Sequence, residues 1–326
     1  MEYNCQERMG TNMSTLNQII KPKLLYKLKI KKGEIPNFLT RLDKNSHYQA
    51  DIWSDKTYKV DPKTHVFTTI QEHFGNRLIK SIKLKKNSVV VDVGCFIGEK
   101  LWQINNKLSL GIGVDIAIPS LKAAQDIDIY GNKYIAADLE NLPFKDNSVD
   151  LVMVFDVIEH LTHAGKGFSE VARVLKPNGQ FLLHIPIKDN KWSFFGWKQK
   201  LSPKEAQKEY FDVGHAPERM LTSAQIKSYL KKNNLKIEKE IFYNSFLVHF
   251  FDRELNKLAS KLFVNLLSKG KSKVSTTRSV HTGKTGKIRN FYGEAIVPIL
   301  EFLSWPDWIL SKLKVGNTYF VLAQKK

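Results

Sequence analysis

The segment Val89–Gly98 constrains the fold more than any other part of the chain. Its first five residues are almost all valine, which is typical of a strand buried on both faces of a parallel sheet. Gly94 and Gly98 follow, and glycines at such positions let the backbone turn sharply and approach a ligand closely. The residues that come next predict a helix over 99–107, whose first amides would face that ligand. This order of strand, glycine loop and helix predicts a nucleotide-cofactor site.

Two acidic residues indicate which cofactor the loop suits. Asp115 ends a second apolar run, Gly111–Val114, about twenty residues downstream, where a carboxylate can bind the two hydroxyls of a ribose. Asp92 stands just before the loop, where its charge would repel a pyrophosphate but attract an ammonium and a sulfonium group. The glycine spacing is also longer than in the dinucleotide pattern. These features favour S-adenosylmethionine over a nicotinamide dinucleotide.

Strand and helix patterns alternate along the middle of the chain. This alternation predicts a doubly wound α/β fold with a parallel sheet. Apolar strands are expected at 89–93, 111–114, 134–137, 149–155, 181–186 and 237–242, and helices after Pro119 and over 167–175 and 222–233. Helical spacing of apolar residues predicts a further helix over 64–82, ahead of the first strand and covering the cofactor cleft. Lys176–Gly179 is expected to form a turn.

The motifs occur in a familiar order. Asp92–Gly98, Asp115, Asp138 with Leu139, and Ser148–Leu161 resemble the successive motifs of class I S-adenosylmethionine-dependent methyltransferases, in particular the type 11 and quinone-biosynthesis O-methyltransferase group. The resemblance covers about Leu84 to Leu235 and a last strand near 318–323. It implies a Rossmann-like, seven-stranded sheet with helices on both faces, an antiparallel last strand, and a helical insertion before that strand.

The resemblance also implies the cofactor contacts. The glycine loop and Asp92 would hold the methionyl part, Asp115 the ribose, and Asp138 with Leu139 the adenine. The full set of expected cofactor-binding residues is Asp92, Gly94, Cys95, Gly98, Asp115, Ile116, Asp138, Leu139 and Phe155.

Three residues just past the fourth strand are candidates for acceptor chemistry: Asp156, Glu159 and His160. If a helix begins there, they share one face. In one interpretation His160, Glu159 or the later His215 is catalytic, acting as a general base on an acceptor hydroxyl. In a second, which rests on the resemblance, Asp156, Glu159, His160 and His215 bind a divalent cation such as Mg²⁺ that acidifies that hydroxyl. In a third, the Glu-His pair only shapes the pocket.

Members of this fold that methylate amine or amide nitrogens usually carry Asn/Asp-Pro-Pro-aromatic at this point. Here the sequence is Asp156-Val-Ile-Glu159, which favours an oxygen acceptor and leaves carbon and sulfur acceptors open.

Charge divides the 326 residues into an acidic centre and basic flanks. The net charge is +19, yet residues 88–186 carry 8 basic and 12 acidic side chains. A mildly acidic core suits a cationic cofactor, and the basic flanks suit an anionic partner such as a membrane surface, a phosphate-bearing lipid or RNA, unless they reflect a compositional bias toward lysine. The two cysteines, Cys5 and Cys95, have neither disulfide-framework nor zinc-site spacing. With no apolar signal or spanning segment in the sequence, the expected location is cytoplasmic, peripheral on the inner membrane face.

Four regions are expected: a basic extension (1–63), the cofactor-binding core (64–245), a helical and basic insertion (246–316) and a final core strand (317–326). The insertion combines an amphipathic stretch at 246–267, a basic stretch at 269–289 and an apolar stretch at 291–313. Trp and Lys also alternate within 189–211. Such segments either face lipid or pack onto the core, and the sequence leaves both open.

The leading hypothesis is an O-directed methyltransferase acting on a small or lipid-linked acceptor, such as a quinone precursor or a lipid-linked glycan. One alternative is an RNA methyltransferase that uses the basic flanks, although no RNA-binding module is recognisable. Another is a noncatalytic, cofactor-binding partner in an assembly.

Overall fold

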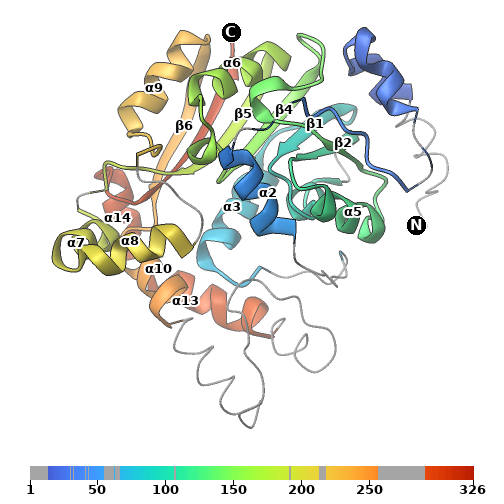
Figure 1. Cartoon of the computed structure of the whole chain (residues 1–326). Coiled ribbons are helices and arrows are strands. Elements are labelled where there is room, and N and C mark those ends of the chain that lie inside the picture. The colour runs from blue at the N-terminus through green and yellow to red at the C-terminus, as the bar shows by residue number, and fades with distance from the viewer. Residues whose placement is uncertain are drawn as a thin grey trace.

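The structure is a computed structural model that describes residues 14–29, 31, 33–40, 42, 44–54, 62, 67–105, 108–190, 192–212, 218–255 and 291–326. Within these residues, seven strands form one sheet in the order β3-β2-β1-β4-β5-β7-β6. Helices lie on both sides of this sheet (Figure 1). The predicted doubly wound, Rossmann-like α/β fold is therefore confirmed.

The strand directions also follow the prediction. The strands are β1 (Ser88–Val93), β2 (Leu108–Asp115), β3 (Lys133–Ala136), β4 (Val149–Phe155), β5 (Leu175–Pro186), β6 (Leu235–Tyr243) and β7 (Thr318–Lys325). Strands β1 to β5 pair in parallel. The last strand, β7, inserts between β5 and β6 and is antiparallel to both. All five parallel strands therefore present their carboxyl ends at the same edge of the sheet.

The helices are α2 (Lys44–Ser54), α3 (Ile70–Ser81), α4 (Glu99–Trp102), α5 (Ile118–Ile127), α6 (Ala164–Val174), α7 (Phe194–Leu201), α8 (Pro203–Asp212), α9 (Ser223–Lys232), α10 (Leu247–His249), α13 (Val297–Leu303) and α14 (Pro306–Lys312). Short 3-10 turns are η1 (Pro22–Leu28), η3 (Leu139–Asn141) and η4 (Ile158–His160), and π-helical turns are η5 (Phe250–Leu255) and η6 (Tyr292–Ile296).

Strand β1 is buried along its whole length because its residues alternate between two apolar layers. Val91 packs in the cluster that includes Phe168 of α6 and Ile226 of α9. Val90 packs in a separate cluster with Ile79 of α3 and Leu101 of α4. This burial on both faces explains the run of valines.

Two local expectations need correction. The helix after the glycine loop ends at Trp102, not at residue 107, and the side-chain amide of Asn105 donates to the Trp102 carbonyl oxygen at 2.6 Å. The stretch Lys176–Gly179 is part of β5, not a separate turn. The β4–β5 register shifts between Val149 and Leu151 opposite this stretch, and Asn178 has φ +63°, so a bulge absorbs the residues that resemble a turn.

The described part of the N-terminal extension packs on the core. The Phe38 amide donates to the Ala136 carbonyl at 2.7 Å, and the Ala136 amide donates to the Pro36 carbonyl at 2.8 Å. Leu16 and Ile20 are buried in the largest apolar cluster. This segment therefore pairs with the otherwise open edge of β3, which removes an unpaired strand edge.

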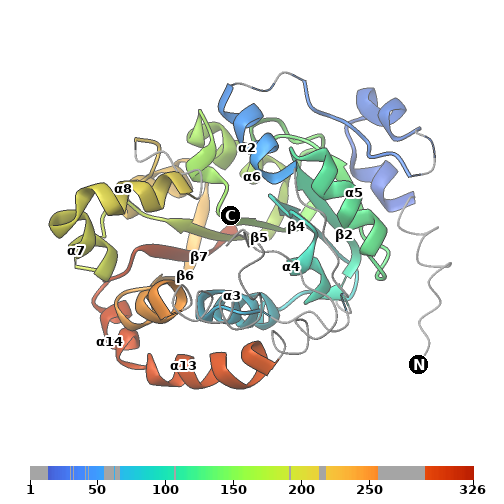
Figure 2. The same cartoon turned by 60° about the horizontal axis from the view of Figure 1, so that its bottom comes forward.

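The insertion is bonded to the helix that precedes β1. The Asp252 carboxylate accepts from the backbone amides of Ile70 at 2.7 Å and Gln71 at 2.9 Å, which caps α3. Burial raises the pKa of Asp252 to about 7, with the two amide donors opposing the shift. Asp307 accepts from the backbone amides of Phe246, Leu247 and Val248, so α14 caps the first turn of the insertion. Helices α10, α13 and α14 accordingly gather beside α3 (Figure 2).

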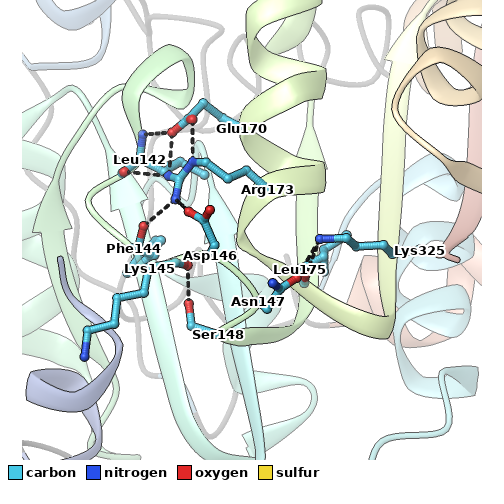
Figure 3. Close-up of polar contacts among 10 residues, drawn as sticks. All are labelled: Leu142, Phe144, Lys145, Asp146, Asn147, Ser148, Glu170, Arg173, Leu175 and Lys325. Atoms are coloured by element: carbon cyan, nitrogen blue, oxygen red, sulfur yellow. Dashed lines mark hydrogen bonds and ion pairs between the residues drawn. The ribbon is translucent and has the colours of Figure 1, made fainter.

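A polar network joins α6 to the loop before β4 (Figure 3). The Arg173 guanidinium donates to the Glu170 carboxylate, to the carbonyl oxygens of Leu142 and Phe144, and to Asp146. Arg173 is 22% exposed and Asp146 is 68% exposed. The bonds from Arg173 to the Leu142 and Phe144 carbonyl oxygens are therefore less exposed to solvent than its ion pair with Asp146.

We expect Arg173→Ala to lower the free energy of unfolding by about 2 to 4 kcal/mol, because it leaves partly buried carbonyl and carboxylate groups without their charged donor. Asp146→Ala should change it by less than about 1 kcal/mol, because an exposed ion pair contributes little. Urea denaturation of the two variants measures the difference. Equal effects would show that the network does not organise this loop.

Candidate functional site

The loop after β1 has the geometry that its glycines suggest. Gly94 and Gly98 have φ values of +73° and +86°. The amides of Gly94 and Cys95 both donate to the Val114 carbonyl oxygen, at 2.8 and 3.1 Å, which holds the loop against the end of β2. A Cβ atom on Gly94 would lie 2.2 Å from Cγ2 of Val157. Both the backbone conformation and the available space therefore require glycine at position 94.

Asp92 lies beneath this loop and is completely buried. Neither of its carboxylate oxygens has a hydrogen-bond partner in the part of the chain that the structure describes. Burial raises the pKa of Asp92 to about 6, the charge of Lys100 opposes the shift, and the charge of Asp115 adds to it. A buried carboxylate is costly without a partner, so this position suits a cationic group of a ligand.

Asp115 ties the loop to the end of β2. Its carboxylate accepts from the amides of Phe96 and Ala117, each at 2.9 Å. Burial raises the pKa of Asp115, and the backbone donors oppose that shift. A carboxylate has about four acceptor positions, so the backbone amides do not exhaust those of Asp115 and a ligand hydroxyl can still donate to it.

The remaining expected cofactor residues lie at the same edge of the sheet. Asp138 follows β3 and accepts from the Glu140 amide at 2.9 Å, and Leu139 beside it is buried. Ile116 follows Asp115 directly, and Phe155 ends β4. The arrangement brings the predicted contacts for the three parts of the cofactor to one edge, and the assignment of each contact stays a prediction.

The residues proposed for acceptor chemistry do not share one helical face. Glu159 and His160 belong to the 3-10 turn η4, and Oε1 of Glu159 lies 4.0 Å from Nε2 of His160. Asp156 lies outside this turn in the left-handed conformation, with φ +55°. Its carboxylate instead lies 3.0 Å from Nδ1 of His184. His215 lies outside the described residues.

His184 is the residue that sequence reasoning missed. It is on β5, 2% exposed, and pairs in register with Phe155 of β4 and Phe320 of β7. The ring centroids of His184 and Phe320 are 4.3 Å apart. In the sequence it is one polar residue within an apolar strand, and only the register between β4 and β5 shows that it lies beside Asp156.

No group of three or more His, Cys, Asp or Glu side chains arranged to hold a metal ion occurs within the described ranges, which leave out His215. Cys95 is buried, and burial raises the pKa of its thiol well above the ordinary value. Its Sγ would lie 2.7 Å from a Cβ placed on Gly113, so it fills space between β1 and β2.

Comparison with known proteins indicates the family that part of the chain resembles. Residues 91–183 match the family described as Methyltransferase domain. An uncharacterised protein of Methanocaldococcus jannaschii is 32% identical over 113 residues, which are 35% of this chain and 47% of that protein. A malonyl-[acyl-carrier protein] O-methyltransferase of Buchnera aphidicola is 25% identical over 66% of this chain and 81% of its own length. A probable tRNA methyltransferase 9B of Bos taurus is 29% identical over 47% of this chain and 31% of its own length.

Among solved structures, the geranyl diphosphate C-methyltransferase of Streptomyces coelicolor A3(2), in complex with Mg²⁺, geranyl-S-thiolodiphosphate and S-adenosyl-L-homocysteine, superposes with a TM-score of 0.55. The match covers 88% of this chain and all of that chain at 11% identity, so it shows the fold alone.

The sheet, the glycine loop and the matched segment define a class I S-adenosylmethionine-dependent methyltransferase domain. Within that class, residues 91–183 are the part of the chain that matches the methyltransferase-domain family model. The chain spans between about a third and a half of the length of the first relatives that it matches, with 47%, 35% and 42% covered.

Proposed function

We propose that this chain is an S-adenosylmethionine-dependent methyltransferase that methylates an oxygen atom of a small or lipid-linked acceptor. The observation that carries the proposal is the buried carboxylate of Asp92, which lies below a glycine loop and has no hydrogen-bond partner among the described residues. An amino group of the cofactor would supply that partner.

Different residues bind the different parts of the cofactor. S-adenosylmethionine supplies a methyl group on a positively charged sulfur atom. Asp92 and the glycine loop bind the methionyl end, and Asp115 binds and orients the ribose. Asp138 and Leu139 bind around the adenine, with Ile116 and Phe155 beside them. The negative charges of Asp92 and Asp115 favour a cationic ligand in this partly enclosed site.

An oxygen acceptor must lose a proton as it is methylated, and two histidine–carboxylate pairs can accept it. One is His160 with Glu159, and the other is His184 with Asp156. In each pair the carboxylate lies beside the imidazole ring, where it can orient the ring toward a hydroxyl. We assign the general base to His160, because it is the more accessible of the two, at 15% side-chain exposure against 2% for His184.

The acceptor classes that we favour are quinone precursors and lipid-linked glycans. The support for a lipid-linked acceptor is the group of exposed aromatic side chains on the insertion, among them Phe302, Trp305 and Trp308. A cytoplasmic location at a membrane surface accords with such an acceptor. Participation of a divalent cation through Asp156, Glu159, His160 and His215 stays a prediction, which activity measured with and without a chelator tests.

The test uses the full chain with radiolabelled S-adenosylmethionine and two acceptor pools, a lipid extract and total RNA. We expect label in the organic phase. Label only in RNA would contradict the acceptor class, and cofactor binding without transfer to either pool would support a noncatalytic role.

Matched variants test the general base. His160→Gln should lower kcat by about 10²- to 10⁴-fold with little change in cofactor affinity, because it removes a base but not a cofactor contact. His184→Gln should retain most of the activity. If the two effects are reversed, the base is His184.

A further inference from the structure

Helices α13 and α14 expose an unusual number of large apolar side chains. Seven of them define what we call the aromatic face: Ile299, Phe302, Leu303, Trp305, Trp308, Ile309 and Leu313. Phe302 is 74% exposed, Leu313 68% and Trp305 57%. Single exposed apolar residues are ordinary, but seven of them between Ile299 and Leu313 mark an interaction surface.

The spacing of these residues shows that the exposure is a property of the two helices. Ile299, Phe302 and Leu303 follow helical spacing on α13, while Val297 of the same helix is buried in the cluster around Phe74. On α14, Trp308 and Ile309 are half exposed, while Asp307 is buried and bonded to the backbone of the first turn of the insertion. Each helix therefore has one side packed on the protein and one apolar side that faces outward.

The charges around the aromatic face are positive. Between residues 297 and 314 the acidic residues are Glu301, which is bonded to Arg77, and Asp307, which is bonded inward. The lysines Lys312 and Lys314 are exposed. Residues 256–290, which connect η5 to the start of this segment, carry nine basic and no acidic side chains in their sequence. Such a charge pattern complements an anionic surface.

The dimensions favour a membrane interface. Helix α14 has seven residues, about 11 Å at 1.5 Å per residue, and α13 continues η6 as one helical stretch over 292–303. Within the described residues no helix is long and apolar enough to cross a membrane. Short helices with outward tryptophans and flanking lysines suit the headgroup region, where an indole ring and an ammonium group both find partners.

The aromatic face is one helix away from the candidate active site. Helix α13 packs on α3, and Trp308 contacts Phe74 of α3 edge-on with ring centroids 6.0 Å apart. On the other side of α3, Gly75 lies against Phe155 and Phe320. Figures 1 and 2 both place α13 and α14 on the side of the molecule away from α2 and α5.

From these observations we infer that the aromatic face docks onto the surface of an anionic lipid bilayer. The outward side chains of α13 and α14 enter the headgroup region, and Lys312 and Lys314 contact the lipid phosphates. This inference goes beyond the proposed function, because docking does not require methyl transfer.

The test measures binding of the full chain to vesicles of phosphatidylcholine with and without phosphatidylglycerol. We expect binding to the anionic vesicles that weakens as salt is raised. The variant Phe302→Ser/Trp305→Ser/Ile309→Ser should bind at least about tenfold more weakly, because it removes three side chains that enter the bilayer. Replacing Lys312 and Lys314 by glutamine should reduce only the preference for phosphatidylglycerol.

Tyr48→Ser is the matched control, because Tyr48 is 54% exposed on α2, away from the aromatic face. It should bind vesicles like the unchanged chain. All variants should retain their affinity for S-adenosylmethionine, which separates this result from the proposed function. Absence of vesicle binding, or equal binding by the triple variant, would overturn the inference. So would a dimer that binds no vesicles and that the triple substitution dissociates, since the face would then join two copies of the chain.

Discussion

Asp92→Asn should weaken S-adenosylmethionine binding by about 2 to 4 kcal/mol, which is about 30- to 1000-fold in Kd. Asp92 is fully buried, and neither carboxylate oxygen has a hydrogen-bond partner among the described residues. A buried charge pair with the ligand would be lost, whereas the amide retains the shape of the side chain. Titration calorimetry at neutral pH measures the effect.

Asp126→Asn is the control for this experiment, because Asp126 is exposed on α5. It should leave the affinity unchanged. If Asp92→Asn also binds the cofactor with unchanged affinity, Asp92 does not contact its cationic group.

The raised pKa of Asp92 also predicts how the stability of the chain and its affinity for the cofactor depend on pH. Burial raises the pKa of Asp92 from 3.8 to about 6, so between these values the folded chain holds a proton that the unfolded chain has lost. The contribution of Asp92 to the free energy of unfolding therefore falls as pH rises from about 4 to about 6. Above that range, and without ligand, the Asp92→Asn variant should be more stable than the unchanged chain by about 1 to 3 kcal/mol.

Cofactor affinity should have the opposite dependence, because the ionised carboxylate is the form that binds a cation. We expect the affinity to rise through about pH 6 in the unchanged chain and to stay nearly constant over that range in Asp92→Asn. If cofactor affinity rises with pH by the same amount in both proteins, the group that titrates is not Asp92.

Gly94→Ala should lower the free energy of unfolding by about 2 to 4 kcal/mol and also weaken cofactor binding. One part of the cost is the left-handed conformation, with φ +73°, which costs a residue with a Cβ about 1 to 2 kcal/mol. The other part is the contact of 2.2 Å between the new Cβ and Cγ2 of Val157. Thermal or urea denaturation, together with calorimetry, measures both effects.

Two further variants separate these parts. Gly33→Ala has a similar φ of +89° and no atom within 4 Å of the new Cβ, so it should show the conformational cost alone. Val157→Ala combined with Gly94→Ala should recover the part that comes from the contact. The loss of stability on Gly94→Ala should be smaller in the Val157→Ala background than in the unchanged chain. If the loss is the same in both backgrounds, crowding by Val157 is not the cause.

The glycine loop and the sheet could be predicted because their determinants are local. Val89–Val93 and Gly94 predict the strand and the turn from neighbouring residues alone, and the structure confirms both, whereas the ribose contact of Asp115 stays a prediction. The pairing of Asp156 with His184 could not be predicted in this way, because it depends on the register between two strands.

The flanking segments were harder to predict for a different reason. The N-terminal extension is expected from its sequence only to be basic, yet Ile20 and Leu28 are buried in the largest apolar cluster, which depends on contacts with distant parts of the chain. An apolar segment such as 291–313 packs in the core of most proteins. Here the described part of the chain provides no second layer over α13 and α14, so the tryptophans of α14 stay exposed.

The most direct test of the cofactor site is a crystal structure of the full chain with S-adenosylhomocysteine. The amino group of the ligand should lie within hydrogen-bonding distance of Asp92, its ribose hydroxyls on Asp115, and its adenine beside Asp138 and Leu139. A ligand bound elsewhere, or a loop occupied by a nicotinamide dinucleotide in preference to an adenosyl compound, would contradict the assignment of this site.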